Sequence, residues 1–203
     1  MQIVLATGNP GKVKEFQQLL APTGHQVRPQ SDFDMPGAEE TGLTFIENAL
    51  IKARNATRHT GLPAMADDSG IEVDALAGAP GIHSARYAGP GADPRANNRK
   101  LLEALEGIPE ERRTARFRCV IAFLRHAEDP APILTQGTWT GRIALSPAGE
   151  GGHGYDPVFL VPELGQTAAE IHADEKNRRS HRGQALAAFL EALRRDGADA
   201  PGP

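Results

Sequence analysis

The sequence has little cysteine, few aromatic residues and no long apolar run. Cys119 is the one cysteine in 203 residues, so no disulfide can form within the chain, and we interpret it as a small core residue. No apolar run approaches the ~18 residues of a membrane-spanning helix, and the N-terminus lacks the basic region and length of a signal peptide. These absences predict a soluble cytoplasmic protein that does not contact membranes.

The chain also lacks an excess of positive charge. Its formal net charge is -4, which argues against a protein that coats nucleic acid, so any phosphate binding must come from local basic residues. The seven histidines are scattered and form no His-Glu-x-x-His pattern, so a zinc enzyme is not expected. A hydrophobic fraction of 39% suits one domain with ample core. We expect a single two-lobed domain over residues 1–195 and a disordered tail over residues 196–203.

The central motif is a pair of adjacent acids, Asp67 and Asp68, followed by a serine and a glycine. Residues 63–66 are typical of the end of a buried strand, so the acids are predicted to lie at a strand end or in a tight turn, where Gly70 can adopt a positive φ. If the strand continued through them, the two acids would point to opposite faces, so one would be functional and the other structural. Adjacent acids in turns are also common as solvated caps.

A second motif is the turn Thr7–Lys12, which lies between a short apolar strand at residues 2–6 and a predicted helix. A strand, glycine-rich turn and helix aim backbone N–H groups and a positive dipole end at an anion. The turn is not a Walker A loop, because its glycines are too close together and Val13 stands in place of the hydroxyl residue. It is either a phosphate-binding turn or a purely structural one.

The next helix is predicted from a capping box. Thr44 and Glu47 stand at the spacing of a capping box, and the helix is expected to run to about His59 and to stop at Gly61. We therefore interpret Glu47 as the capping partner. Lys52 lies away from most of the apolar stripe and by default is a solvated lysine.

The second half of the sequence is predicted to form further strands and two helices. Residues 116–125 and 133–145 have strand character, and Asp93 with Pro94 begins a helix. A second glycine-rich loop, residues 149–157, carries a histidine ring and a tyrosine that leave a flat surface for stacking, or it is simply a surface turn. A basic cluster at residues 174–183 precedes the C-terminal helix and would usually be a solvated face.

These segments converge on a nucleotide polyphosphate. The first turn can bind an anion, Glu40 and Asp68 suit a hard cation, and the second loop offers a ring. Carboxylates without histidine or cysteine spacing favour Mg²⁺ over Zn²⁺.

Six segments, taken in order, resemble the inosine triphosphate pyrophosphatase family, in particular its bacterial members that act on non-canonical purine nucleoside triphosphates. Together they extend over nearly the whole chain apart from the tail, and six in order are strongly specific. The matching segments are Leu5-Ala6-Thr7-Gly8-Asn9-Pro10-Gly11-Lys12, residues 39–49, Ala66-Asp67-Asp68-Ser69-Gly70, Gly78-Ala79-Pro80-Gly81, Gly154-Tyr155-Asp156-Pro157 and Ser180-His181-Arg182-Gly183.

The resemblance implies a mixed α/β fold, with a twisted central sheet, flanking helices and two lobes enclosing a substrate cleft, in a homodimer. It implies Mg²⁺-dependent hydrolysis of dITP, ITP or XTP to the monophosphate and pyrophosphate, which removes them from the nucleotide pool, with no nucleic-acid or membrane partner. Glu40 and Asp68 would be the metal-linked acids, and Asp68 the catalytic base. The substrate-binding residues implied are Thr7, Gly8, Asn9, Pro10, Gly11, Lys12 and Lys52 for the phosphates, Ser69 as a further substrate contact, and His153, Gly154, Tyr155, Asp156, Lys176, His181 and Arg182 for the base and sugar.

The implied chemistry is physically reasonable. An isolated aspartate, with a pKa of about 3.9, is a poor base, but beside Mg²⁺ it need only orient a water already acidified by the metal. Donors such as Arg182 or His181 would meet the 6-carbonyl of hypoxanthine or xanthine, whereas the amino group of adenine would leave them unpaired at about 1–3 kcal/mol each. That argument does not explain rejection of guanine.

The chain departs from the family pattern at one position. His153 stands where the family commonly has phenylalanine before Gly-Tyr-Asp-Pro. An imidazole can still stack but titrates near neutrality, so we expect substrate affinity to vary with pH more than in a phenylalanine enzyme.

Two other functions are consistent with the same motifs. One is a general nucleoside triphosphate phosphatase that releases orthophosphate, which the missing Walker A hydroxyl disfavours. The other is a nucleotide-sensing protein without turnover, which the pair Glu40 and Asp68 disfavours. Product analysis separates all three.

Overall fold

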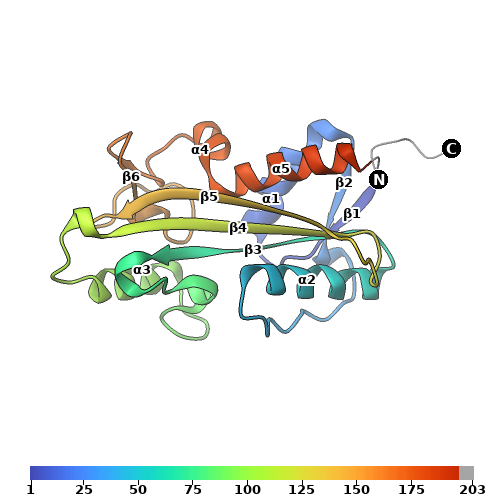
Figure 1. Ribbon diagram of the computed structural model, residues 1–203, viewed down its shortest axis with the longest axis horizontal. Coiled ribbons are helices and arrows are strands. Elements are labelled where there is room, and N and C mark those ends of the chain that lie inside the picture. The colour runs from blue at the N-terminus through green and yellow to red at the C-terminus, as the bar shows by residue number, and fades with distance from the viewer. Residues whose placement is uncertain (197–203) are drawn as a thin grey trace. The chain divides into compact units, whose positions relative to one another are not determined.

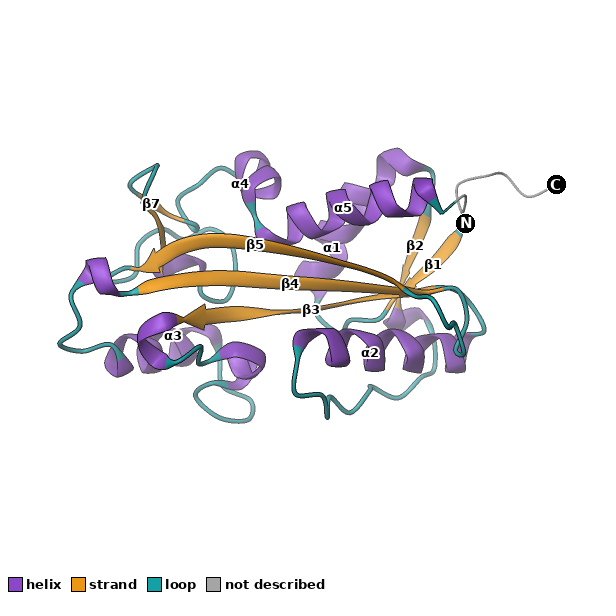
Figure 2. Ribbon diagram, in the orientation of Figure 1, coloured by secondary structure: helices purple, strands orange, loops and turns teal. Residues whose placement is uncertain are grey.

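The computed structural model describes residues 1–196, apart from the side chain of Leu19. The tail predicted over residues 196–203 therefore lies outside the described residues except for Asp196. Figure 2 shows helices and strands that alternate along the first half of the chain. The strands are β1 (Gln2–Leu5), β2 (Gln26–Pro29), β3 (Ala64–Val73), β4 (Thr114–Leu124), β5 (Ile133–Ile143), β6 (Phe159–Val161) and β7 (Gln166–Thr167). The α-helices are α1 (Pro10–Leu20), α2 (Phe45–Thr60), α3 (Pro94–Ala104), α4 (Ala173–Arg179) and α5 (His181–Arg195).

The strands form one mixed sheet in the order β2-β1-β3-β4-β5-β6-β7. Strand β1 pairs in parallel with both β2 and β3, while β6 pairs antiparallel with β5 and β7. The described part of the chain contains no helix long and apolar enough to cross a membrane. The predicted mixed α/β fold with flanking helices is confirmed.

The chain divides into two compact units, which are described separately. Unit 1 comprises residues 1–68, 120–136 and 185–203, and unit 2 comprises residues 69–119 and 137–184. The long strands β3, β4 and β5 each contribute residues to both units. The predicted domain limit at residue 195 stays a prediction.

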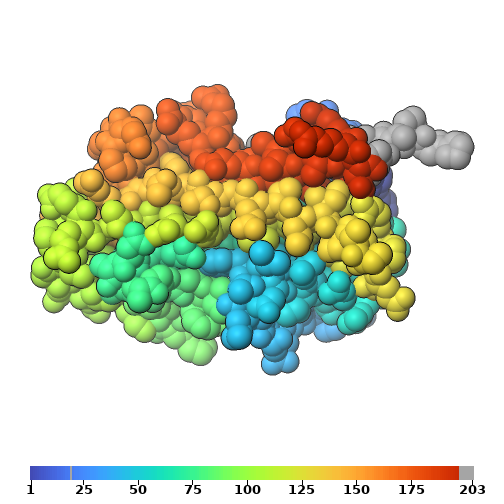
Figure 3. All heavy atoms as spheres, in the orientation of Figure 1, coloured from blue at the N-terminus to red at the C-terminus, as the bar shows by residue number. Residues whose placement is uncertain are grey.

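In unit 1, helix α2 lies on one face of the sheet, and α1 and α5 lie on the other (Figure 1). The core between α2 and the sheet is built largely from small residues, including Ala49, Ala53 and Ala56 of the helix. These alanines are fully buried and let α2 pack closely on the strands. On the opposite face, the rings of Phe123 in β4 and Phe189 in α5 pack with centroids 5.6 Å apart. The outer side of α5 is drawn in red at the surface in Figure 3.

The capping box predicted for α2 is confirmed. The Oγ1 of Thr44 accepts a hydrogen bond from the backbone N–H of Glu47, and the Glu47 carboxylate accepts one from the Thr44 hydroxyl at 3.0 Å. The helix ends at Gly61, whose φ of 67° is the left-handed conformation of a C-cap. The two ends of α2 are therefore fixed by local sequence.

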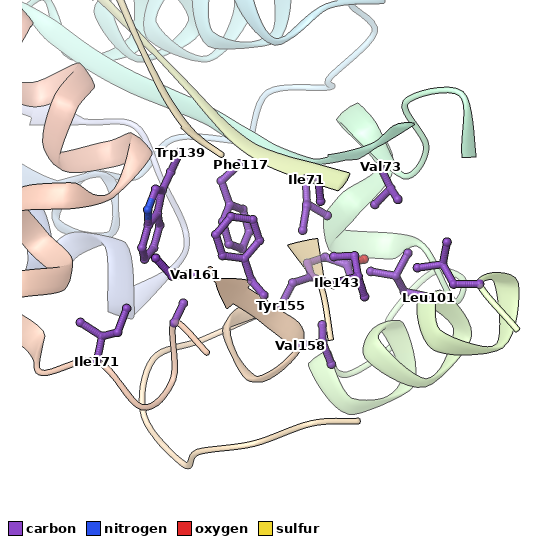
Figure 4. Close-up of a cluster of buried hydrophobic side chains, with 14 residues drawn as sticks. Ile71, Val73, Leu101, Phe117, Trp139, Ile143, Tyr155, Val158, Val161 and Ile171 are labelled. Atoms are coloured by element: carbon purple, nitrogen blue, oxygen red, sulfur yellow. The ribbon is translucent and has the colours of Figure 1, made fainter. Parts of the chain in front are cut away.

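Unit 2 has an aromatic core, shown in Figure 4. The ring of Phe117 lies 4.4 Å from that of Phe159, and Trp139 lies 5.2 Å from Phe159. Strand β3 contributes Ile71 and Val73 to this core, so its second half packs on the same cluster. Burial alternates along this half of the strand, since Ile71 and Val73 are buried while the intervening acid is partly exposed.

The predicted position of the two acids is wrong. Strand β3 continues without a break through Asp67, Asp68 and Gly70, so these residues lie inside a strand and not at a strand end or tight turn. Both acids are buried. Their turn-like composition is overridden because each carboxylate is matched by a lysine from a helix that packs on the sheet.

The basic cluster before the C-terminal helix also differs from the prediction. Helix α5 begins at His181, so His181, Arg182 and Gly183 form its first turn, and His181 and Arg182 are buried instead of solvated. A Cβ on Gly183 would lie 1.8 Å from the carbonyl oxygen of Asn177 in α4. Glycine is thus required where α5 begins against the end of α4.

Candidate active site

The alternation of strand β3 directs its two acids to different helices of unit 1. Asp67 follows Met65 on the face of α1, and its Oδ2 lies 2.7 Å from the Nζ of Lys12. Asp68 follows Ala66 on the face of α2, and its Oδ1 lies 2.8 Å from the Nζ of Lys52. The expectation that a continuing strand would separate the two acids is therefore met.

Lys52 joins the two acids predicted to hold a metal. Its ammonium lies 2.8 Å from Asp68 and 3.3 Å from Oε1 of Glu40, and its side chain is 14% exposed. The default interpretation of Lys52 as a solvated lysine is wrong. Helical periodicity indicated its side of the helix but not that two carboxylates would lie there.

Burial and charge oppose each other in this cluster. Burial raises the pKa of Asp68 above its usual value, and the charge and hydrogen bond of Lys52 counteract only part of that effect. Burial by itself would lower the pKa of Lys52, but the negative charges of Asp68, Asp67 and Glu40 outweigh it and raise that pKa. Lys52 therefore stays charged, and Asp68 is a stronger base than a solvated aspartate.

One oxygen of Asp68 is available to a cation. Its Oδ2 is buried and has no hydrogen-bond partner within the described residues. The same residues contain no cluster of three or more carboxylate, histidine or cysteine ligands. Because Mg²⁺ usually keeps several waters and binds through one or two carboxylates plus substrate phosphates, Glu40 and Asp68 fit this ion.

The loop that carries Glu40 is fastened along α2. Asn48 Oδ1 accepts a hydrogen bond from the backbone N–H of Gly42 at 2.9 Å, and Asn55 Nδ2 donates to the carbonyl of Pro36 at 2.9 Å. Lys52 lies between these asparagines along one stripe of the helix, at the spacing i, i+4, i+7. The helix thereby holds the loop on either side of Glu40.

The first glycine-rich turn differs in detail from the prediction. Asn9 is the N-cap of α1, and its Oδ1 accepts hydrogen bonds from the N–H groups of Gly11 and Lys12 at 2.9 and 3.3 Å. These two N–H groups are therefore not open to an anion as predicted. The signal was present in the sequence, because asparagine before Pro10 is typical of an N-cap. Lys12 is close enough for its positive charge to oppose part of the rise in the pKa of Asp68.

In unit 2 the structure brings Arg182 and His153, both predicted to bind base and sugar, together with Ser69, predicted as a further substrate contact. Nη2 of Arg182 lies 3.4 Å from Oγ of Ser69, and Nη1 of Arg182 lies 3.5 Å from Nε2 of His153. The His181 ring stacks on the core ring of Phe117, with centroids 4.7 Å apart and planes at 13°. The guanidinium is thus held between a hydroxyl and an imidazole.

The second glycine-rich loop is folded around Asp156. The Asp156 carboxylate accepts hydrogen bonds from the His153 N–H at 2.6 Å and from Lys176 Nζ at 2.5 Å. A Cβ on Gly152 would lie 2.1 Å from that carboxylate, so glycine is required there. Asp156 is therefore buried and engaged, while the His153 side chain is 48% exposed and can meet a ligand.

Tyr155 does not provide the predicted stacking surface. Its ring lies in the core of unit 2, and its hydroxyl donates to the carbonyl of Ser84 at 2.7 Å. Burial raises the pKa of Tyr155 well above its usual range, so the hydroxyl stays protonated. The sequence could not show this, because the hydrogen bond joins residues 71 positions apart.

Three buried polar residues support these clusters without being among the predicted site residues. Asp67 is the partner of Lys12, Asn48 fastens the Glu40 loop, and Asn98 of α3 donates to the carbonyl of Gly154 at 3.1 Å. For the two asparagines the available signal was an amide at a position of the helix that packs inward. Asp67 had been identified only as the structural member of the acid pair.

The fold and these clusters define a class: an α/β protein with a mixed sheet, a carboxylate–lysine cluster in one unit and a guanidinium–imidazole cluster in the other. The model of the Ham1 family matches residues 3–192, and the chain belongs to this family.

Many named proteins and several solved structures are similar to this chain. The chain is 67% identical to a protein named dITP/XTP pyrophosphatase from Thioalkalivibrio sulfidiphilus, with 95% of this chain and 98% of the relative covered. A protein of the same name from Yersinia pseudotuberculosis is 60% identical, with the same coverage. The solved structure of a HAM1 protein from Coxiella burnetii is similar with a TM-score of 0.90 and 49% identity, covering 96% of this chain and 99% of that chain. These findings confirm the resemblance drawn from the six segments.

Proposed function

We propose that the protein hydrolyses non-canonical purine nucleoside triphosphates such as dITP, ITP and XTP to the monophosphate and pyrophosphate. The names of its relatives support this substrate class. The observation that carries the proposal is the pairing of Glu40 and Asp68 on one lysine, with Asp68 Oδ2 buried and without a hydrogen-bond partner in the part of the chain that the structure describes. A buried carboxylate oxygen without a donor is costly unless a ligand satisfies it.

The residues of unit 1 would act on the phosphates. Lys12 and Lys52 would supply the positive charge that a polyphosphate needs, and the Thr7–Lys12 turn would contact the phosphates. Asp68 would accept the proton of the attacking water, a role favoured by its raised pKa. Mg²⁺, when bound by Glu40 and Asp68, would neutralise phosphate charge and acidify a coordinated water.

The residues of unit 2 would recognise base and sugar. Arg182 and His181 are donors that can meet a 6-carbonyl, and His153 offers an exposed ring for stacking. Adenine, with an amino group at that position, would leave such donors unpaired. Ser69, which contacts Arg182, would touch the same ligand.

The test is a product assay with Asp68→Asn. Wild type with Mg²⁺ should release pyrophosphate and dIMP from dITP. Its kcat/KM for ATP should be at least tenfold lower, because each unpaired donor costs about 1–3 kcal/mol and about 1.4 kcal/mol corresponds to a tenfold change. Asp68→Asn keeps the shape, removes the charge and should lower kcat by about 10²–10⁴-fold, the usual range for a general base. Asp34→Asn, at an exposed acid, is the control.

Each alternative has its own result in this assay. Orthophosphate as the first product would identify a general phosphatase, and tight dITP binding without any product would identify a nucleotide sensor. Wild-type turnover by the Asp68→Asn protein would show that another group is the base.

A further inference from the structure

We propose that Asn98 of helix α3 is a positioning residue for nucleobase recognition, because it tethers the loop that presents His153. This inference rests on the proposed function, and it assigns a specificity role to a residue outside the predicted site. The contact that supports this inference is the hydrogen bond from Asn98 Nδ2 to the carbonyl oxygen of Gly154, which is 3.1 Å long. Gly154 directly follows His153 in the chain.

The loop has other supports before and after His153. The N–H of Gly151 donates to the carbonyl of Ala169 at 3.2 Å, and the N–H of His153 donates to Asp156. Both of these contacts lie before the His153 side chain along the loop or at its own N–H. After the imidazole, the N–H of Asp156 donates to the His153 carbonyl at 3.2 Å, and Tyr155 lies in the core. The Asn98 contact is the one that holds Gly154, between His153 and Tyr155.

The side of the loop that faces α3 is not filled by packed side chains. A hollow of about 1140 Å³ lies there, lined by the glycines of residues 149–154 and by the α3 residues Arg95, Asn98, Arg99 and Leu102. Glycines carry no side chain to fill such a space, and several here have positive φ, including Gly152 and Gly154. A loop with a hollow behind it depends on discrete tethers to keep one conformation.

The burial and hydrogen bonding of Asn98 fit this role. It is 6% exposed, so its amide is held within α3 with little freedom. Within residues 1–196 its Oδ1 has no hydrogen-bond partner, so the donation to Gly154 is the polar contact that its amide makes. A buried amide that satisfies only its donor half is costly for folding, which is expected of a residue kept for function.

The neighbouring residue supplies a matched control. Asn97 has the same side chain, lies on the same helix and is 5% exposed. Its Oδ1 accepts from the N–H of Ala88 at 2.7 Å and its Nδ2 donates to the carbonyl of Ala85 at 3.2 Å, so it fastens a different loop. A general loss of packing in α3 would follow from either substitution, whereas loss of loop position would follow only from changes at Asn98.

The experiment compares Asn98→Ala, Asn98→Asp and Asn97→Ala. For Asn98→Ala we expect the KM for dITP and the inhibition constant of dIMP to rise about five- to tenfold, the worth of one hydrogen bond, while kcat changes less than twofold. Asn98→Asp keeps the size, replaces the donor by an acceptor that faces a carbonyl and should bind dIMP at least as weakly. Asn97→Ala should leave both constants within twofold of wild type.

Inorganic tripolyphosphate is the second probe, because it has phosphates but no base. Its inhibition constant should be unchanged in all three variants. The proposal is overturned if Asn98→Ala binds dIMP as wild type does, if Asn97→Ala weakens dIMP binding equally, or if tripolyphosphate is weakened as much as dIMP. Failure of the proposed function is a separate result, namely no pyrophosphate from dITP with wild type, and calorimetric binding of dIMP would still test Asn98.

Discussion

At the scale of single residues, Lys52 determines the electrostatic state of the carboxylate cluster. It is nearly buried and contacts both Glu40 and Asp68. Two carboxylates that share one ammonium keep a net negative charge, which attracts a divalent cation. Because the ammonium compensates part of that charge, the protein can also fold without the cation. The lysine thus reconciles a stable apoprotein with the proposed cation site.

Replacement of Lys52 by methionine should destabilise the protein by about 3 kcal/mol, because it leaves a buried charge without its partner. Asp68→Asn in the Lys52→Met background should recover part of that loss, since the unpaired charge is then absent. Urea unfolding of the single and double variants forms a double-mutant cycle. Lys14→Met, at an exposed lysine of α1, serves as the control. Additive effects in the cycle would show that the contact contributes nothing to stability.

Single-residue roles were only partly predictable. Glu40, Asp68 and Lys12 were identified by motif, and the structure places them in one cluster of unit 1. Lys52 was identified by resemblance alone, because its carboxylate partners are 12 and 16 positions away in the sequence and nothing local indicates the contact. The core position of Tyr155 was missed for the same reason.

At the scale of elements, the connection between β4 and β5 is organised by one aspartate. Asp129 is 4% exposed, and its carboxylate accepts hydrogen bonds from the N–H groups of Arg125 and Ala131, each at 2.9 Å, and from the Arg125 guanidinium. Burial by itself would raise the pKa of Asp129, but these hydrogen bonds outweigh it and lower that pKa below its usual value. The ionised form is therefore the one that stabilises the fold.

Because the folded-state pKa of Asp129 is depressed, its contribution is present above the unfolded-state pKa and is lost as the pH falls through the folded value. Asp129→Asn should cost about 1–3 kcal/mol at pH 7, from the loss of charge-assisted hydrogen bonds, and less at low pH. Urea unfolding at pH 7 and in steps below pH 4 (about the unperturbed value of an aspartate) measures the difference. A constant difference across this range would exclude ionisation of Asp129 as the cause.

The elements themselves were predicted best where local sequence fixes them. The ends of α2 follow from Thr44, Glu47 and Gly61, all of which act within one turn of the helix. The course of β3 through its acids was missed because the composition favours a turn, while the lysines that permit a strand come from helices distant in sequence. Tertiary contacts there override local preference.

At the scale of the whole molecule, each unit carries one chemically distinct cluster. Unit 1 holds the acids and lysines, and unit 2 holds the guanidinium, imidazole and serine. The mixed α/β class was implied by the family resemblance, and the strand and helix periods of the sequence agree with it. The division of long strands between two units depends on packing alone.

A homodimer is the assembly that the resemblance implies. Sedimentation equilibrium at micromolar concentration should then give twice the chain mass of 21.6 kDa. The described residues leave Leu43 and Leu145 exposed at 84% and 60%, and large exposed apolar side chains are common at such contacts. A single species of the chain mass at every concentration would contradict the dimer.

The alternating directions of Asp67 and Asp68 restrict how the gene can change in length. One codon inserted just before Asp67 would turn each acid to the opposite side of the sheet, offering Asp67 to Lys52 and moving Asp68 away from it. Two inserted codons would restore the sides but shift both acids by a full repeat of the pleat. Viable insertions and deletions should therefore be absent from this strand and confined to the surface connections.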